Sequence, residues 1–380
     1  MRRWRGMLAL TSLATAVFAA STAPGAAART RPAETLQRQV DAIHDTGTVG
    51  VQAEVASAQT RESAYAGTAA INSRRAMPRD GRFRIGSATK TFTATVVLQL
   101  VGEGRMSLDD TVERWLPGVV RGHGNDGGRI TVRQLLQHTS GIPDVEPEIP
   151  ALNSADGYRA ERFRTYTPEE LVGLAMRQPP TDTGWSYSNT NYTLAAMIIH
   201  KVTGRSWAQE VRDRVIRPLG LRDTSTPGVF PFILGPHAQG YASFDTGTDA
   251  DTGTDVTTLN SSMAIGSGSI ISTAHDLNRF YAALLGGRLL APAQLDEMTT
   301  TVPAPGLGDV RYGLGLAEIP LPCGGSYFGH RGELLGYVTW GGATRNGARA
   351  AVVYVTSVGG HDTEADMMTL VGQELCRTRS

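Results

Sequence analysis

The sequence has little cysteine, no excess of either charge and no long apolar run beyond its first residues. Acidic and basic residues number 36 each, and no basic cluster follows residue 28, which argues against nucleic acid and anionic membranes as partners. No segment after residue 28 is apolar enough to anchor the chain in a bilayer. The absence of a Gly-x-Ser-x-Gly motif argues against the nucleophile turn of α/β-hydrolases.

The two cysteines, Cys323 and Cys376, are too few and too widely spaced for a structural zinc site. In an exported protein such a pair is typical of a disulfide, and two free thiols are the alternative. We expect no metal and no cofactor.

The first 28 residues are typical of a secretory signal peptide. Arg2, Arg3 and Arg5 precede an apolar run over residues 7–20, and small residues at 26–28 offer a cleavage site. The run is shorter than a bilayer-spanning helix. We therefore expect cleavage after residue 28 and release of an extracellular, monomeric protein.

Strand patterns lie at both ends of the remaining chain, and helical patterns lie between them. Thr167 followed by Pro168 and two glutamates, for example, is a well-formed helix start. This distribution predicts an antiparallel β-sheet flanked by helices from both chain ends, with an inserted all-helical lobe. We assign residues 33–378 to one domain, with an α/β lobe at about 33–105 and 265–378 and a helical lobe at about 106–264. The predicted strands cover 49–56, 63–71, 83–85, 313–316, 327–330, 337–340 and 350–356.

Ser87 and Lys90 open an apolar helix predicted over residues 91–101. Residues three apart share one face of a helix, so the hydroxyl and the amine can meet. A serine hydroxyl becomes a nucleophile when a neighbouring base takes its proton, and an amine can be that base if its pKa is depressed. Alone, the pattern is also that of a capped helix with a surface lysine.

Two further polar clusters lie at the expected lobe junctions. One is Tyr187-Ser188-Asn189, and the other is His330-Arg331-Gly332 at the end of an apolar strand. A phenol whose pKa is lowered by a cation can relay protons. A strand that carries glycine permits close approach of substrate.

The order and spacing of these motifs resemble the serine β-lactamase and penicillin-binding DD-peptidase superfamily. The chain is most similar to class C-like enzymes and to secreted D-alanyl-D-alanine carboxypeptidases of actinomycetes. The resemblance implies a β-lactamase/transpeptidase-like fold and covers nearly the whole mature chain. The stretches that carry it are 83–110, 135–142, 187–192, 202–204, 218–221, 268–277, 312–316 and 329–332.

The resemblance also implies a role for each motif residue. Ser87 would be the acylated nucleophile and Lys90 its activating amine. Tyr187 would shuttle protons, and Asn189 would bind the substrate amide. His330 would supply positive charge near the Tyr187 oxygen.

Two backbone N–H groups, those of Ser87 and Glu333, would form the oxyanion hole in such an enzyme. His138 lies in the 135–142 motif and is interpreted as a turn-stabilising residue rather than a catalyst. The cysteine pair falls where the secreted carboxypeptidases place their disulfide.

The sequence departs from the carboxypeptidase pattern at three positions. Arg331 and Glu333 stand where those relatives have hydroxyl residues, and Ala317 replaces an arginine that binds the substrate carboxylate. Three interpretations stay open. Arg331 could replace the lost positive charge, Glu333 could capture a substrate ammonium, or the two could pair with each other.

The leading functional prediction is a D-alanyl-D-alanine carboxypeptidase-like peptidase that acts on peptidoglycan stems or related small peptides. A class C-like β-lactamase, a carboxyl-esterase and a D-aminopeptidase or D-amidase are the alternatives within the enzyme class. A non-catalytic penicillin-binding protein is the alternative outside it.

The motif Asp-Thr-Gly, which is tandemly repeated over residues 245–256, is also that of aspartic proteases. The apolar strand context that those enzymes need is missing here. A mobile surface loop is the preferred interpretation, and a weak calcium loop is a second one.

Overall fold

The computed structural model describes residues 32–181, 184–244 and 253–377. The expected signal peptide and residues 245–252 of the Asp-Thr-Gly repeat lie outside these ranges. Among the described residues, no helix is both long enough and apolar enough to cross a membrane.

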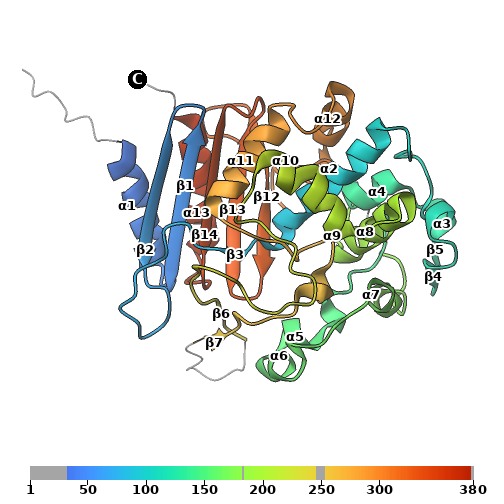
Figure 1. Cartoon of the computed structure of the whole chain (residues 1–380), viewed down its shortest axis with the longest axis horizontal. Coiled ribbons are helices and arrows are strands. Elements are labelled where there is room, and N and C mark those ends of the chain that lie inside the picture. The colour runs from blue at the N-terminus through green and yellow to red at the C-terminus, as the bar shows by residue number, and fades with distance from the viewer. Residues whose placement is uncertain (1–31, 182–183, 245–252, 378–380) are drawn as a thin grey trace, which may run out of the picture. The chain divides into compact units, whose positions relative to one another are not determined.

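An eight-stranded antiparallel sheet joins the two ends of the chain. Its strands are β1 (Gly50–Ser57), β2 (Arg61–Gly67), β9 (Val302–Pro303), β10 (Arg311–Tyr312), β11 (Ala317–Pro320), β12 (Ser326–Leu334), β13 (Tyr337–Thr344) and β14 (Arg349–Val355). Their order is β2-β1-β14-β13-β12-β11-β10-β9 (Figure 1). Strand β1 pairs with β14, with Val51 opposite Val355. The N-terminal hairpin is thereby held by the last strand of the chain.

Helices cover both faces of this sheet. Helices α1 (Pro32–Asp45) and α13 (Thr363–Cys376) pack on one face, and α11 (Ala274–Leu285) packs on the other. Val353 and Val355 of β14 belong to the core beneath α1 and α13, whereas Val352 and Tyr354 belong to the core beneath α11. Successive side chains of a strand point to opposite faces. After Arg349, strand β14 carries only alanine, valine and tyrosine, in keeping with the burial of both of its faces.

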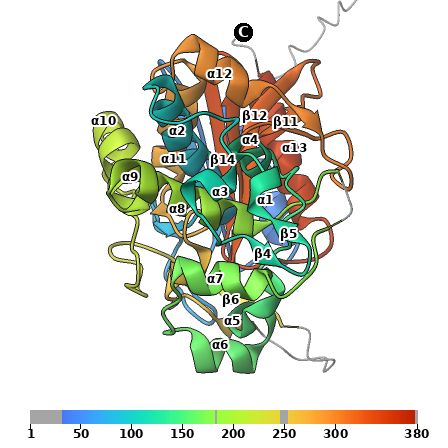
Figure 2. The same cartoon turned by 90° about the vertical axis from the view of Figure 1, so that its right-hand side faces the viewer.

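Most of the regular secondary structure between β2 and α11 is helical. Figure 1 shows helices α3, α4, α7 and α8 on the side of α2 that faces away from β1 and β2, and Figures 1 and 2 show α5 and α6 at the bottom of both views. The helices are α2 (Thr89–Gly102), α3 (Val112–Trp115), α4 (Val132–Gln137), α5 (Pro150–Asn153), α6 (Ala155–Glu161), α7 (Pro168–Ala175), α8 (Asn189–Thr203), α9 (Trp207–Val211), α10 (Arg217–Leu219) and, after α11, α12 (Pro292–Thr299). Short strands β3 (Phe83–Arg84), β4 (Arg121–Gly122), β5 (Asn125–Asp126), β6 (Tyr241–Ala242), β7 (Thr254–Asp255) and β8 (Ile271–Ser272) form two-stranded pairs.

The predicted fold class is confirmed: an antiparallel sheet is flanked by helices from both chain ends. The helix start at Thr167 is confirmed as well, because its hydroxyl and the Glu170 side chain form a reciprocal capping box. The division into two lobes stays a prediction.

The segment 143–156 contains the short helices η3 (Glu146–Glu148) and α5 and the start of α6. One strand prediction was wrong. Residues 313–316 were expected to be a strand, but they form a turn between β10 and β11. Gly315 has a φ of 78° there, a left-handed conformation that ends an extended strand.

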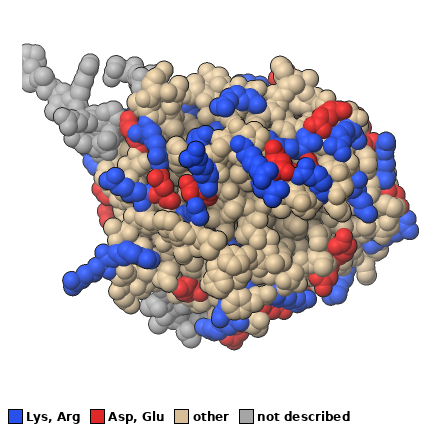
Figure 3. All heavy atoms as spheres, viewed as in Figure 1, with Lys and Arg blue, Asp and Glu red and all other residues tan. Residues whose placement is uncertain are grey.

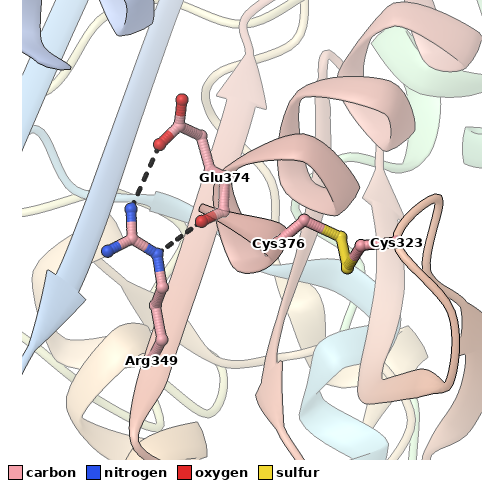
Figure 4. Close-up of a disulfide and its surroundings, with 4 residues drawn as sticks. All are labelled: Cys323, Arg349, Glu374 and Cys376. Atoms are coloured by element: carbon pink, nitrogen blue, oxygen red, sulfur yellow. Dashed lines mark hydrogen bonds and ion pairs between the residues drawn. A yellow bond between two sulfur atoms is a disulfide. The ribbon is translucent and has the colours of Figure 1, made fainter. Parts of the chain in front are cut away.

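Cys323 and Cys376 form a disulfide with a Cα–Cα distance of 5.9 Å (Figure 4). Cys376 ends α13, and Cys323 lies in the turn between β11 and β12. Two residues earlier on α13, the buried Glu374 pairs with Arg349 of β14. Helix α13 is thus attached to the sheet by a covalent bond and by an ion pair.

The face of the molecule in Figure 3 carries side chains of both signs. Blue and red groups are interspersed between uncharged areas, in keeping with the equal numbers of acidic and basic residues.

Removal of the disulfide should lower stability. The cross-link spans 53 positions, for which the chain-entropy estimate is about 4 kcal/mol and roughly 5 °C in melting temperature. We expect the Cys323→Ser/Cys376→Ser double variant and the reduced wild type to melt alike, both below the oxidised protein. Two titratable thiols in unreduced, denatured protein would contradict the pairing.

Candidate active site

Ser87 lies in a tight turn, η1 (Gly86–Ala88), directly before α2. Gly86 has a φ of 50°, and a side-chain carbon there would lie 2.4 Å from the backbone of Glu333. A side-chain carbon on Gly332 would lie 2.0 Å from the carbonyl oxygen of Ile85. Only glycine fits at either position, and the two glycines let the Ser87 turn contact β12. The expected oxyanion-hole residues, Ser87 and Glu333, are therefore adjacent.

Lys90 lies one turn further along and is fully buried. Its Nζ lies 2.9 Å from Ser87 Oγ, and it donates hydrogen bonds to Asn189 Oδ1 at 2.7 Å and to the Ser267 carbonyl oxygen at 3.1 Å. The predicted meeting of Ser87 and Lys90 on one helical face is confirmed. The alternative of an exposed surface lysine is wrong.

Burial lowers the pKa of Lys90 to about 7, although the charges of Asp144 and Glu146 act in the opposite direction. An ordinary lysine titrates near 10.4. Above neutral pH the amine is therefore largely uncharged and can accept the Ser87 proton, as a general base requires.

Tyr187 lies beside this amine, with Nζ of Lys90 4.7 Å from the centre of its ring. Loss of hydration raises the pKa of Tyr187 well above its usual value, while its hydrogen bond with Ser87 acts in the opposite direction. The expectation of a lowered tyrosine pKa is therefore wrong for this state of the site. Tyr187 is a neutral phenol that can donate a proton.

His330 is buried near Tyr187, with ring centres 6.4 Å apart. Burial lowers the pKa of His330 to about 3, and the nearby Lys90 acts in the same direction. Its Nε2 lies 2.8 Å from the hydroxyl of Tyr312, and its Nδ1 contacts the Arg331 carbonyl oxygen. The expectation that His330 supplies positive charge is wrong, because a buried imidazole beside an amine stays neutral at physiological pH.

Asn189 contacts both Lys90 and two carboxylates. Its Nδ2 donates to Asp144 at 3.2 Å and to Glu146 at 2.7 Å, and its backbone N–H donates to Asp144 at 3.0 Å. Loss of hydration raises the pKa of both acids, and for Glu146 repulsion from Asp144 and Glu333 adds to it. The side-chain N–H groups of Asn189 are thus occupied by carboxylates rather than free for a substrate amide.

Arg331 is held by carboxylates on both sides. Its guanidinium binds Glu364 of α13 through two hydrogen bonds of 2.6 Å and Glu333 through one of 2.6 Å. Of the three interpretations of Arg331 and Glu333, direct pairing describes this geometry. The bidentate partner, Glu364, was not part of any prediction.

Sequence reasoning missed the residues that surround the motif side chains. Asp144 and Glu146 lie in a segment with no recognisable motif, and their two-residue spacing alone does not indicate proximity to Asn189. Ser267, Tyr312 and Glu364 contact the site only through tertiary packing.

Comparisons with known proteins agree with this geometry. The profile of the Beta-lactamase family matches residues 33–374. Penicillin-binding protein 4* of Bacillus subtilis (strain 168) is 27% identical over 291 residues, 72% of this chain and 60% of that protein. The chain thus spans about 60% of the length of the curated relatives it matches.

Two solved structures are similar over nearly their whole length. A D-stereospecific amidohydrolase from Streptomyces sp. is 41% identical with a TM-score of 0.82, covering 90% of this chain and 98% of that one. The D-amino acid amidase from Ochrobactrum anthropi SV3 is 30% identical with a TM-score of 0.76, covering 89% and 95%.

The depressed pKa of Lys90 predicts the pH dependence of acyl transfer. Activity should rise with pH through about 7 and fall below it, because protonation removes the base. The measurement is the pH–rate profile of Ser87-dependent hydrolysis of a neutral ester, whose acidic limb reports the protonation of Lys90. Lys90→Arg, which cannot lose its proton, should reduce kcat by roughly 10²–10⁴-fold. Full activity at pH 5 would contradict the assignment.

Removal of the Glu146 charge should move the acidic limb of the pH–rate profile to lower pH. Glu146 raises the pKa of Lys90, so Glu146→Gln should make the amine easier to deprotonate. Glu148→Gln is the matched control, because Glu148 lies two residues away and bonds Gln178 instead. Equal profiles for the two variants would show that Glu146 does not influence Lys90.

Proposed function

The chain belongs to the Beta-lactamase family of serine hydrolases, and from that premise we propose that it hydrolyses amides of D-amino acids that carry a free α-ammonium group. This function was one of the alternatives to the carboxypeptidase prediction. The similarity to a D-stereospecific amidohydrolase and a D-amino acid amidase supports the stereochemistry and the bond type.

The observation that carries the proposal is the charge distribution around Ser87. Asp144 and Glu146 adjoin Asn189, and Glu333 interacts electrostatically with Glu146. Repulsion among these acids is relieved when a cation binds between them. A substrate ammonium would supply that cation and would donate charge-assisted hydrogen bonds to these carboxylates.

A D-Ala-D-Ala substrate would instead need a cation for its free carboxylate. Ala317 takes the place of the arginine that the carboxypeptidase pattern has there. The charge of Arg331 is already compensated by Glu364 and Glu333, to which its Nε and Nη2 are bonded at 2.6 Å. The carboxypeptidase prediction is therefore less well supported than the amidase.

In the proposed reaction, neutral Lys90 takes the proton of Ser87 as Oγ attacks the carbonyl carbon. Backbone N–H groups at Ser87 and Glu333 stabilise the oxyanion. The amide nitrogen leaves after receiving a proton from the Lys90–Tyr187 pair, and an acyl-enzyme remains. Water then attacks this ester and the same pair accepts its proton; the bond to Ser87 Oγ breaks, Oγ takes up the proton, and the free acid is released.

We further propose that the enzyme is exported. The pattern of residues 1–28 supports this location, and a disulfide is typical of proteins in oxidising compartments. The monomeric state stays a prediction.

A substrate panel tests the proposed function. D-phenylalanine amide should be hydrolysed at least roughly tenfold more efficiently than its N-acetylated form, because acetylation removes the ammonium and leaves the carboxylates unpaired. The L-enantiomer and an acyl-D-Ala-D-Ala peptide complete the panel. Hydrolysis of only the peptide would overturn the amidase in favour of the carboxypeptidase.

Glu333→Gln should raise KM for the free-amine amide and leave hydrolysis of a neutral ester unchanged. Glu318→Gln on the neighbouring strand β11 is the matched control, because Glu318 bonds Thr301 and Ser326. An unchanged KM in Glu333→Gln would remove Glu333 from ammonium recognition.

A further inference from the structure

His138 has an unusual backbone conformation for a buried residue. It caps α4 in the left-handed region with a φ of 62° and is fully buried. Residues other than glycine rarely adopt this conformation. The other two described residues that do so without being glycine, Asn72 and His123, are exposed. A specific set of contacts must therefore favour histidine here.

His138 binds the chain on both sides of Tyr187. Its carbonyl oxygen accepts a hydrogen bond from the N–H of Ser186 at 2.9 Å. Its ring Nδ1 lies 3.2 Å from the N–H of Ser188. The two neighbours of Tyr187 in the sequence are thus bonded to the same residue, one through the backbone and one through the side chain.

The ring of His138 also packs against Tyr187 itself. The two ring centres are 4.3 Å apart with planes inclined by 31°. On its other edges the imidazole contacts Tyr312 and Tyr192, at 4.9 and 5.4 Å. The Tyr187 ring therefore has the imidazole on one side and the amine of Lys90 4.7 Å from its centre.

These contacts require one of the two neutral tautomers of the imidazole, the one protonated on Nε2. Nδ1 accepts from the Ser188 N–H and also faces Nδ2 of Asn191 at 3.2 Å. Because two N–H donors face Nδ1, this nitrogen must be an acceptor, and the ring proton lies on Nε2. Asn191 is itself oriented by Ser140, whose hydroxyl donates to Asn191 Oδ1 at 2.7 Å. Burial lowers the pKa of His138 far below its usual value, with Lys90 and His330 acting in the same direction, which agrees with a neutral ring.

We propose that His138 is a positioning residue that fixes Tyr187 beside Ser87 and Lys90. The residue acts through two hydrogen bonds to the backbone around Tyr187 and through its ring. The earlier interpretation of a turn-stabilising histidine is thereby extended to the catalytic geometry. The inference depends on Tyr187 taking part in acyl transfer, but not on the identity of the natural substrate.

Two variants separate the hydrogen bonding of the His138 side chain from the packing of its ring. His138→Asn keeps an oxygen acceptor near the position of Nδ1 and tolerates a positive φ. His138→Phe keeps an aromatic ring but removes the acceptor. We expect His138→Asn to retain kcat within about tenfold and His138→Phe to lose roughly 10²-fold, with KM little changed, because small misplacements of catalytic groups are costly.

A double-mutant cycle with Tyr187→Phe distinguishes positioning from general stability. If His138 acts through the Tyr187 hydroxyl, His138→Phe should change kcat less than about threefold in the Tyr187→Phe background. The readouts are hydrolysis of a neutral phenyl ester and the rate of Ser87 acylation followed by intact mass. Both remain informative if the D-amino acid amide proves not to be the substrate.

Thermal unfolding of each variant controls for folding, and His138→Ala replaces His138→Phe in the cycle if the latter does not fold. An equal loss of kcat in both backgrounds would overturn the proposal. So would kcat within threefold of wild type in a folded His138→Phe variant.

Discussion

The burial of one uncharged amine is the constraint on which the rest of this site depends. Lys90 is fully buried and bonds to Ser87, Asn189 and Ser267, which come from three distant parts of the chain. A charged ammonium in such a place is costly, so its pKa falls to about 7 and the amine becomes a base. The hydrogen bonds of the Lys90 amine also hold the turn at Ser87, the start of α8 at Asn189 and the backbone at Ser267 in place relative to one another.

The surrounding structure supports this arrangement from two sides. Glycines at 86 and 332 allow the Ser87 turn to touch β12, and Glu364 of α13 holds Arg331 on the same strand. On the other side, the carboxylates of Asp144 and Glu146 bind Asn189. Helix α13, which the disulfide and Glu374 attach to the sheet, thereby contributes to the active site through Glu364.

Much of the fold, and the proximity of Ser87 and Lys90, could be predicted because local sequence patterns determine them. Alternating or apolar runs identify the main strands, and Ser87 and Lys90 meet because residues three apart share a helical face. The protonation states of Tyr187 and His330 could not be predicted, since they depend on burial by remote segments. The partners of Asn189 and Arg331 lie 43 to 45 and 33 positions away, so no local pattern reveals them. The turn at 313–316 was missed because its apolar residues match a strand pattern, whereas the conformation of Gly315 decides the structure.

The charge state of Lys90 can be measured directly because the sequence contains only two lysines, Lys90 and Lys201. Selective labelling of lysine side chains with ¹⁵N gives two signals, and Lys90→Arg assigns them. Lys201 is exposed and serves as the internal reference. The structure predicts that the Lys90 signal titrates near pH 7 and that the pH–rate profile follows it. A Lys90 ammonium that stays protonated through pH 9 would contradict the central claim that a buried neutral amine activates Ser87.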